Sequence, residues 1–152
     1  MTATDRLKEM GISLPEPPQP AGSYTRAMRS GSQLFISGQL PLVRGVIQYG
    51  GVVGGDVTAD QGQEAARICA LNALSILEAE AGSLDSIRII RIGGYVSCSP
   101  DFTGQAQVIN GASDLFAAVL GERGVHARLA VGVCALPLGA SVELEVIAEI
   151  EA

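Results

Sequence analysis

The last third of the chain places one arginine and two glutamates on neighbouring predicted strands. Arg128 begins an apolar run, and Glu143 and Glu145 alternate with Leu144 and Val146 on the next run. Because successive side chains of a strand point to opposite faces, both glutamates lie on one face. A guanidinium held at a strand end can bind a carboxylate through two parallel hydrogen bonds, and a nearby glutamate can orient or deprotonate water. These residues would suit a small substrate that carries a carboxylate.

An ion pair is a second interpretation of the same residues. Arg128 and one of the two glutamates could form a structural pair, because charged side chains are common on exposed strand faces. The residue types and their spacing leave both interpretations open.

Other kinds of site find less support. The only histidine is His126, so a Ser-His-Asp triad would have to use it, and no acid paired with it is found nearby in the sequence. The cysteines Cys69, Cys98 and Cys134 lack zinc-site spacing, and we interpret them as free, buried thiols in a reducing compartment. The glycine-rich run at 50–55 matches no phosphate-binding motif. We therefore expect no metal site.

Composition narrows the class of protein. The chain has 152 residues and a net charge of −6, which is one domain's length and argues against non-specific nucleic-acid binding. The amino-terminal residues resemble neither a signal peptide nor a membrane span, so we expect a soluble, cytoplasmic protein. Only 17% of the residues are charged, well below the usual quarter, so something other than water is expected to cover part of the surface.

Hydrophobic periodicity predicts an amino-terminal arm at 1–21 and one domain at 22–152. The arm begins with a short helix over Asp5–Met10 and continues into four prolines within 15–20. Thr58 is a helix N-cap with Gln61 as its capping-box partner, and Gly82 ends that helix. The predicted strands cover 24–31, 33–41, Val46–Val53, Ser86–Ser99, Ala127–Ala135 and Ser141–Glu151, and a second long helix covers Thr103–Leu120.

This order of elements indicates an α+β fold with a mixed sheet. Two helices interleaved with the strands can cover only one face of the sheet, so the other face needs a different cover. Within the strand over Ser86–Ser99, the pair Gly93-Gly94 is a candidate β-bulge.

The sequence resembles the Rid family, also called the YjgF/YER057c/UK114 family. The resemblance is carried by LFISGQLP at 34–41, by HARLAVGVCALPLGASVELEVIAEI at 126–150, by GSYTRA at 22–27 and by the helix with Asn72. It implies a chorismate-mutase-like fold and a homotrimer with ligand sites between the subunits. It also implies hydrolysis of reactive imines or enamines, such as 2-aminoacrylate, to 2-oxo acids and ammonia, with no metal or organic cofactor.

The resemblance also assigns site residues by position. Arg128 matches the arginine that binds the substrate carboxylate, and Glu145 matches the acid that helps to place the attacking water. Tyr24 and the segment Ser37-Gly38 match residues that line the cleft, and Asn110 stands near a ligand-contacting asparagine.

The chain departs from compact members of the family around the arginine. His126 and Ala130 replace a usual proline and a frequent cysteine, Ser23 stands where a proline is usual, and the proline-rich arm is additional. His126 could supply a proton donor, or it could be a loop histidine that hydrogen-bonds to the backbone. These departures are typical of a divergent branch.

Three functions therefore stay open at the level of sequence. The first is imine or enamine hydrolysis, and the second is a binding or regulatory protein for 2-oxo acids and similar small carboxylates that lacks the chemistry. The third is a ribonuclease, of the endoribonuclease L-PSP type, or a translation inhibitor, which are names often attached to this family. The acidic composition and the lack of a basic or aromatic RNA surface favour the first two.

Overall fold

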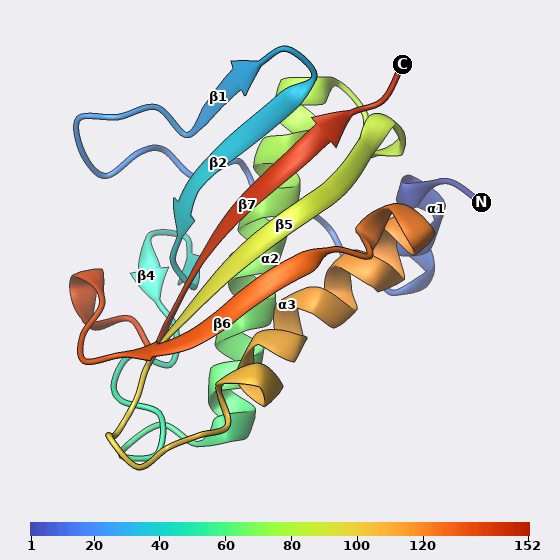
Figure 1. Cartoon of the computed structure of the whole chain (residues 1–152). Coiled ribbons are helices and arrows are strands. Elements are labelled where there is room, and N and C mark those ends of the chain that lie inside the picture. The colour runs from blue at the N-terminus through green and yellow to red at the C-terminus, as the bar shows by residue number, and fades with distance from the viewer.

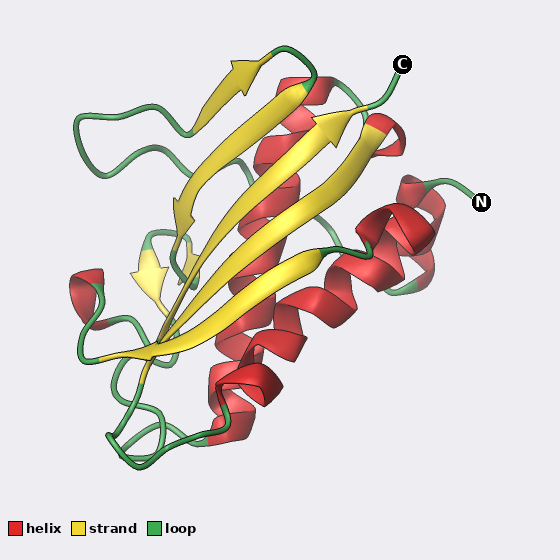
Figure 2. Ribbon diagram, in the orientation of Figure 1, coloured by secondary structure: helices red, strands yellow, loops and turns green.

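A mixed five-stranded sheet forms the front layer of the molecule, and two long helices lie behind it (Figures 1 and 2). The structure is a computed structural model that describes residues 1–152. The strand order is β1-β2-β7-β5-β6, in which only the β5–β6 pair is parallel. The strands span β1 (Ala27–Ser30), β2 (Gln33–Gln39), β5 (Ile87–Ser97), β6 (Ala127–Val133) and β7 (Val142–Ile150). The predicted α+β class with a mixed sheet is confirmed.

The two long helices are α2 (Ala59–Ala81) and α3 (Gln105–Leu120). Thr58 caps α2 through a capping box, in which the backbone N–H of Gln61 donates to Thr58 Oγ1 at 3.1 Å. Gly82 ends the helix in a left-handed conformation with a φ of 82°. The predicted caps of α2 are therefore confirmed, and α3 begins two residues after the predicted start.

The core lies between these helices and the rear face of the sheet. Small residues on α2 let the helix approach the strands closely, and larger residues on α3 fill the remaining space. The buried residues that face inward are Ala66, Ala70, Ala73, Leu74 and Leu77 on α2, Val108, Ile109, Leu115, Phe116 and Val119 on α3, and Ile92, Val96, Val142, Leu144, Val146 and Ala148 on the strands.

The predicted strand over Val46–Val53 is wrong for most of its length. The chain instead forms a small hairpin of β3 (Leu42–Val43) and β4 (Val46–Ile47), followed by turns. In these turns the carboxylate of Asp56 accepts a hydrogen bond from the backbone N–H of Val52 at 2.9 Å. This side chain satisfies a backbone group that a strand would have paired with its neighbour.

The predicted bulge at Gly93-Gly94 is also wrong. The β5–β7 register shifts between Ile89 and Arg91, whereas both glycines stay in regular pairing with β7. The glycines make room for neighbours instead: a Cβ at Gly94 would lie 2.6 Å from the side chain of Ile109 on α3. Close packing of α3, and not an irregular strand, therefore explains this glycine.

A third helix, α1 (Ala3–Glu9), lies at the amino-terminal end of the arm and packs against α3 (Figure 1). It starts two residues before the predicted helix, because Thr2 provides a capping box with Asp5. Ala3 and Leu7 are buried and extend the core beyond the two long helices. The arm is thus part of the packed structure.

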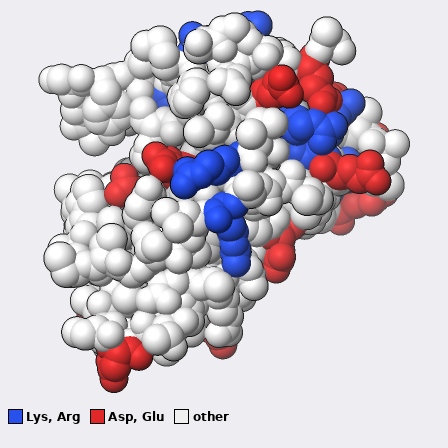
Figure 3. Space-filling model, in the orientation of Figure 1, with Lys and Arg blue, Asp and Glu red and all other residues white.

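The front face of the sheet is open and carries few charges (Figure 3). Charged side chains gather at one corner, where Arg88 and Arg123 form ion pairs with Glu151. Of the cysteines, Cys69 is buried as predicted, whereas Cys134 is exposed and Cys98 is half-buried. None of the helices is both long and apolar enough to span a membrane.

Candidate functional site

Arg128 lies on the edge strand β6 and points toward the helices. Its Cα pairs with Ile92 of β5, and Ile92 is buried on the helix side of the sheet. Two groups of α3 hold the guanidinium: Nη1 donates to Ser113 Oγ at 3.1 Å, and Nη2 donates to the backbone carbonyl of Ala106 at 3.1 Å. These two contacts hold the arginine between β6 and α3.

Arg128 forms no ion pair within the chain. Five ion pairs occur in the structure, and they involve Arg26, Arg67, Arg88, Arg91 and Arg123. The guanidinium therefore stays without an acidic partner while both of its contacts are neutral oxygens. Such a positive charge, already oriented, favours the binding of an anion from outside.

His126 joins the same group through Ser113. Its Nδ1 lies 2.5 Å from the carbonyl oxygen of Gly124, which can only accept, so Nδ1 carries the proton. In the neutral imidazole, Nε2 then accepts the hydroxyl hydrogen of Ser113 across 2.9 Å. Because the Ser113 hydroxyl donates its hydrogen to His126, the lone pairs of Ser113 Oγ can accept the hydrogen bond from Arg128. His126 therefore does bind the backbone, and it also orients the serine.

Asn110 lies on the same face of α3. It is four residues after Ala106 and three before Ser113, so helical geometry places it between the two groups that hold Arg128. The structure thus brings Arg128 and His126 together between β6 and α3, and it places Asn110 on the adjoining face of α3. Ser113 belongs to this group and was missed, because a helical serine carries no sequence signal until its neighbours are known.

The two glutamates lie on the opposite, open face of the sheet. Glu145 pairs with Gly93 and Glu143 with Tyr95, whereas the neighbouring Val142, Leu144 and Val146 of β7 point to the helices. Within one chain, the glutamates and Arg128 are therefore separated by the sheet. This arrangement could not be read from strand patterns, because it depends on the register between β5 and both of its neighbours.

Glu143 lies beside the Ser37-Gly38 segment of β2. A Cβ at Gly38 would collide with Glu143 Oε1, so only glycine leaves room for the carboxylate there. The pKa of Glu143 is raised above its ordinary value, first because the side chain is partly buried and second because the charge of Glu145 is near. A carboxylate with a raised pKa is a better proton acceptor near neutral pH.

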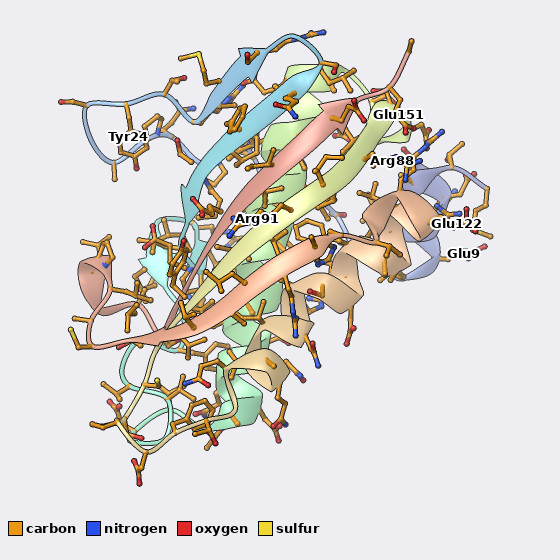
Figure 4. The ribbon with its side chains drawn as sticks, viewed as in Figure 1. Glu9, Tyr24, Arg88, Arg91, Glu122 and Glu151 are labelled. Atoms are coloured by element: carbon orange, nitrogen blue, oxygen red, sulfur yellow. The ribbon has the colours of Figure 1, made fainter.

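Glu145 is already engaged by two neighbours. It accepts a hydrogen bond from Tyr95 Oη at 3.0 Å and lies 3.6 Å from Arg91 Nη1. This hydrogen bond raises the pKa of Tyr95, because the phenol loses a donor interaction when it ionises. Arg91 lies near the centre of the open face (Figure 4). Of the two glutamates, Glu143 is the one without a hydrogen-bond or ion-pair partner.

The remaining predicted residues lie beside β2 or in the arm. Ser37 donates its hydroxyl hydrogen to the carbonyl of Thr25 at 2.7 Å, which fastens β2 to the segment before β1. Tyr24 is 52% exposed and accepts a hydrogen bond from the backbone N–H of Ala21 at 3.3 Å. Figure 4 shows it on the loop that precedes β1, away from Arg91. The structure therefore does not bring Tyr24 to Arg128 within one chain.

Comparison with known proteins identifies close relatives. A family model described as "YjgF/chorismate mutase-like, putative endoribonuclease" matches residues 4–150. Protein TCP17 of Trypanosoma cruzi is 45% identical over 148 residues, which is 95% of this chain and 91% of that protein. The crystal structure of Atu1372 from Agrobacterium tumefaciens superimposes with a TM-score of 0.90 at 45% identity, covering 99% of this chain and 93% of that one.

One relative has a name that states an activity. A 2-iminobutanoate/2-iminopropanoate deaminase of Dermatophagoides farinae is 28% identical over 140 residues, which is 92% of this chain and 95% of that protein.

The contact between the two glutamates gives a first prediction. Glu145→Gln removes the charge that helps to raise the pKa of Glu143, so that pKa falls, yet stays above the ordinary value of 4.5 because burial remains. Carboxyl ¹³C chemical shifts followed through a pH titration measure it. Glu149→Gln, on the same face of β7 but farther away, is the matched control. An unchanged pKa in Glu145→Gln would contradict the coupling.

The same shift predicts a pH-dependent stability. The folded protein holds the Glu143 proton more tightly than the unfolded chain, so this group stabilises the fold at low pH and loses that contribution as the pH rises through its raised pKa. The Tm of Glu143→Gln relative to wild type is therefore expected to increase between pH 4.5 and neutrality.

Proposed function

Because the chain belongs to the YjgF/chorismate mutase-like family, we propose that it hydrolyses imines and enamines derived from amino acids to 2-oxo acids and ammonia. The observation that carries this proposal is Arg128, a fixed guanidinium with no acidic partner in its own chain. The deaminase of Dermatophagoides farinae supports the reaction class at the level of the family.

Arg128 would bind the substrate carboxylate. A guanidinium has five N–H donors, and Ser113 and Ala106 each take one. The remaining donors include one hydrogen on each terminal nitrogen, which suffices for a bidentate pair with a carboxylate. The substrate carbon next to that carboxylate is then held at a defined place for attack by water.

Glu143 is our proposed proton acceptor, with Glu145 as its neighbour in the same cluster. As water attacks the iminium carbon, its oxygen forms the new C–O bond, the electron pair of the C=N bond moves to nitrogen, and Glu143 accepts a water proton. Glu143 then returns this proton to the nitrogen of the resulting carbinolamine. The hydroxyl proton passes to the Glu143 carboxylate as the C=O bond forms and the C–N bond breaks, so that nitrogen leaves as ammonia, which takes up the last proton as ammonium. The reaction consumes one water and releases a 2-oxo acid.

We propose that the complete site forms between copies of the chain in a homotrimer. One chain holds Arg128 and Glu143 on opposite faces of the sheet, so a shared site needs the arginine of one copy and the glutamate of the next. The open face also exposes apolar side chains that a second copy would cover, namely Met28, Phe35 and Leu129. Burial of such a face is a usual driving force for assembly.

A binding protein without the chemistry is the second candidate. It is favoured by the fact that the Arg128 group is complete within one chain, whereas the glutamates are not part of it. Binding of 2-oxo acids without release of ammonia from any amino-acid-derived imine would select this function.

Replacement of Arg128 tests the carboxylate site. Arg128→Ala is expected to weaken binding of a 2-oxo acid such as 2-oxobutanoate about 100-fold, because a charge-assisted bidentate pair is lost. Ammonia release from freshly generated 2-aminoacrylate should fall to the rate in buffer. Arg67→Ala, which removes an arginine of α2 that pairs with Glu64, is the matched control and should retain 2-oxo acid binding. Equal affinity of Arg128→Ala and wild type would refute the site.

Mixing two inactive variants tests the shared site. Arg128→Ala and Glu143→Gln should each be inactive alone. When the two kinds of subunit are mixed in equal amounts, random assembly pairs an intact Arg128 with an intact Glu143 at roughly one quarter of the subunit interfaces, so up to that fraction of the wild-type rate should return. The measurement is ammonia release after co-expression of the two variants with different tags. No recovery in a mixed oligomer would place each site within one chain.

Ser113 provides a test of how Arg128 is held. Ser113→Ala removes the acceptor for Nη1 and leaves His126 Nε2 without its donor, so 2-oxo acid binding should weaken about five-fold. Ser113→Thr keeps the hydroxyl and should restore most of the affinity. Calorimetric titration measures both. A Ser113→Ala variant that binds like wild type would show that Ala106 alone positions the arginine.

A further inference from the structure

A cavity lies on the side of the molecule formed by the arm, the β3–β4 hairpin and α2. Its volume is about 540 Å³, which is within the range of small-molecule sites. The walls include Glu16 of the arm, Leu42 and Arg44 of the hairpin, and Ile68, Leu71 and Asn72 of α2. No residue of the Arg128 group or of the glutamate cluster lines it, so its ligand would be separate from the proposed substrate.

Asn72 gives this cavity an unused hydrogen-bond acceptor. Its Nδ2 donates to the carbonyl oxygens of Leu40 at 3.1 Å and Leu42 at 3.0 Å, which fixes the orientation of the amide. The residue is only 2% exposed, yet its Oδ1 accepts no hydrogen bond from the protein. The oxygen is not fully enclosed by the protein, so at the wall of the cavity it can accept from a donor on a bound molecule.

Two side chains of opposite charge line this cavity without forming an ion pair with each other. Glu16 and Arg44 both line it, and neither forms an ion pair with any residue of the chain. Arg44 is held at the tip of the hairpin, where it and Gly45 have φ values of 51° and 79°, as in a two-residue type I′ turn. The turn therefore fixes the backbone from which the Arg44 side chain extends at the rim of the cavity.

We propose that this cavity binds an apolar α-amino acid. The carboxylate of the ligand would pair with Arg44, and its ammonium group would donate to Asn72 Oδ1 and to Glu16. The apolar side chain would lie against Leu42, Ile68 and Leu71, which supply the hydrophobic part of the wall. A zwitterion with an aliphatic side chain matches all three features, whereas a simple anion or cation would leave one charge unpaired.

Binding would also join the arm to the domain. Glu16 belongs to the proline-rich arm, whereas the other proposed contacts come from α2 and the hairpin. A ligand that touches all three should therefore stabilise the folded chain and protect the arm from proteolysis.

Calorimetric titration of the 152-residue chain with three matched compounds tests the proposal. L-Leucine carries both charges, 4-methylpentanoate lacks the ammonium group, and 3-methylbutylamine lacks the carboxylate. L-Leucine should bind at least about 10-fold more tightly than either analogue, because each analogue loses a charge-assisted contact. If both analogues bind as well as leucine, or if none of the three binds, the proposal is overturned.

Variants place the ligand in this cavity. Arg44→Asn keeps a residue that suits the turn but removes the guanidinium, and Leu71→Trp fills the cavity; each should reduce leucine affinity at least about 10-fold. Arg128→Ala should bind leucine like wild type. If instead Arg128→Ala abolishes binding and Arg44→Asn does not, leucine occupies the Arg128 site and the second site is refuted.

Discussion

The sheet is covered by helices on one face only, so each side chain of the central strands lies either in the core against the helices or on the open face. Residues of β5 and β7 that pair with each other share a face, so apolar side chains such as Ile92 and Val146 enter the core together. Their neighbours in sequence must then point to the open face, where Glu143, Glu145 and Tyr95 lie. The position of the polar cluster is thus a direct consequence of where the helices pack.

The edge strand β6 completes this division. Its parallel register with β5 turns Arg128 toward α3, where neutral oxygens of Ser113 and Ala106 hold it without cancelling its charge. A guanidinium in this state is ready for an external anion, because binding adds charge-assisted hydrogen bonds without first breaking an ion pair. The separation of arginine and glutamates by the sheet is what makes a site shared between copies the natural arrangement for the proposed hydrolysis.

Two glycines allow the glutamates to lie across the neighbouring strands. At Gly38 a side chain would displace Glu143, and at Gly93 a Cβ would lie 2.7 Å from Glu145 Oε1. Space for a carboxylate above a strand, together with partial burial, also accounts for the raised pKa of Glu143. The amino-terminal arm makes a comparable contribution on the other side, where it closes a cavity against α2 and the hairpin.

The sequence by itself determined the class of fold, the caps of α2 and the strand that carries the two glutamates, because these depend on local periodicity and on the chemistry of single residues such as Thr58 and Gly82. Only the tertiary structure decided which of the site residues contact one another. Strand register put Arg128 and Glu143 on opposite faces, and helix packing joined Ser113 to His126. Such contacts link residues distant in sequence, so no local pattern encodes them.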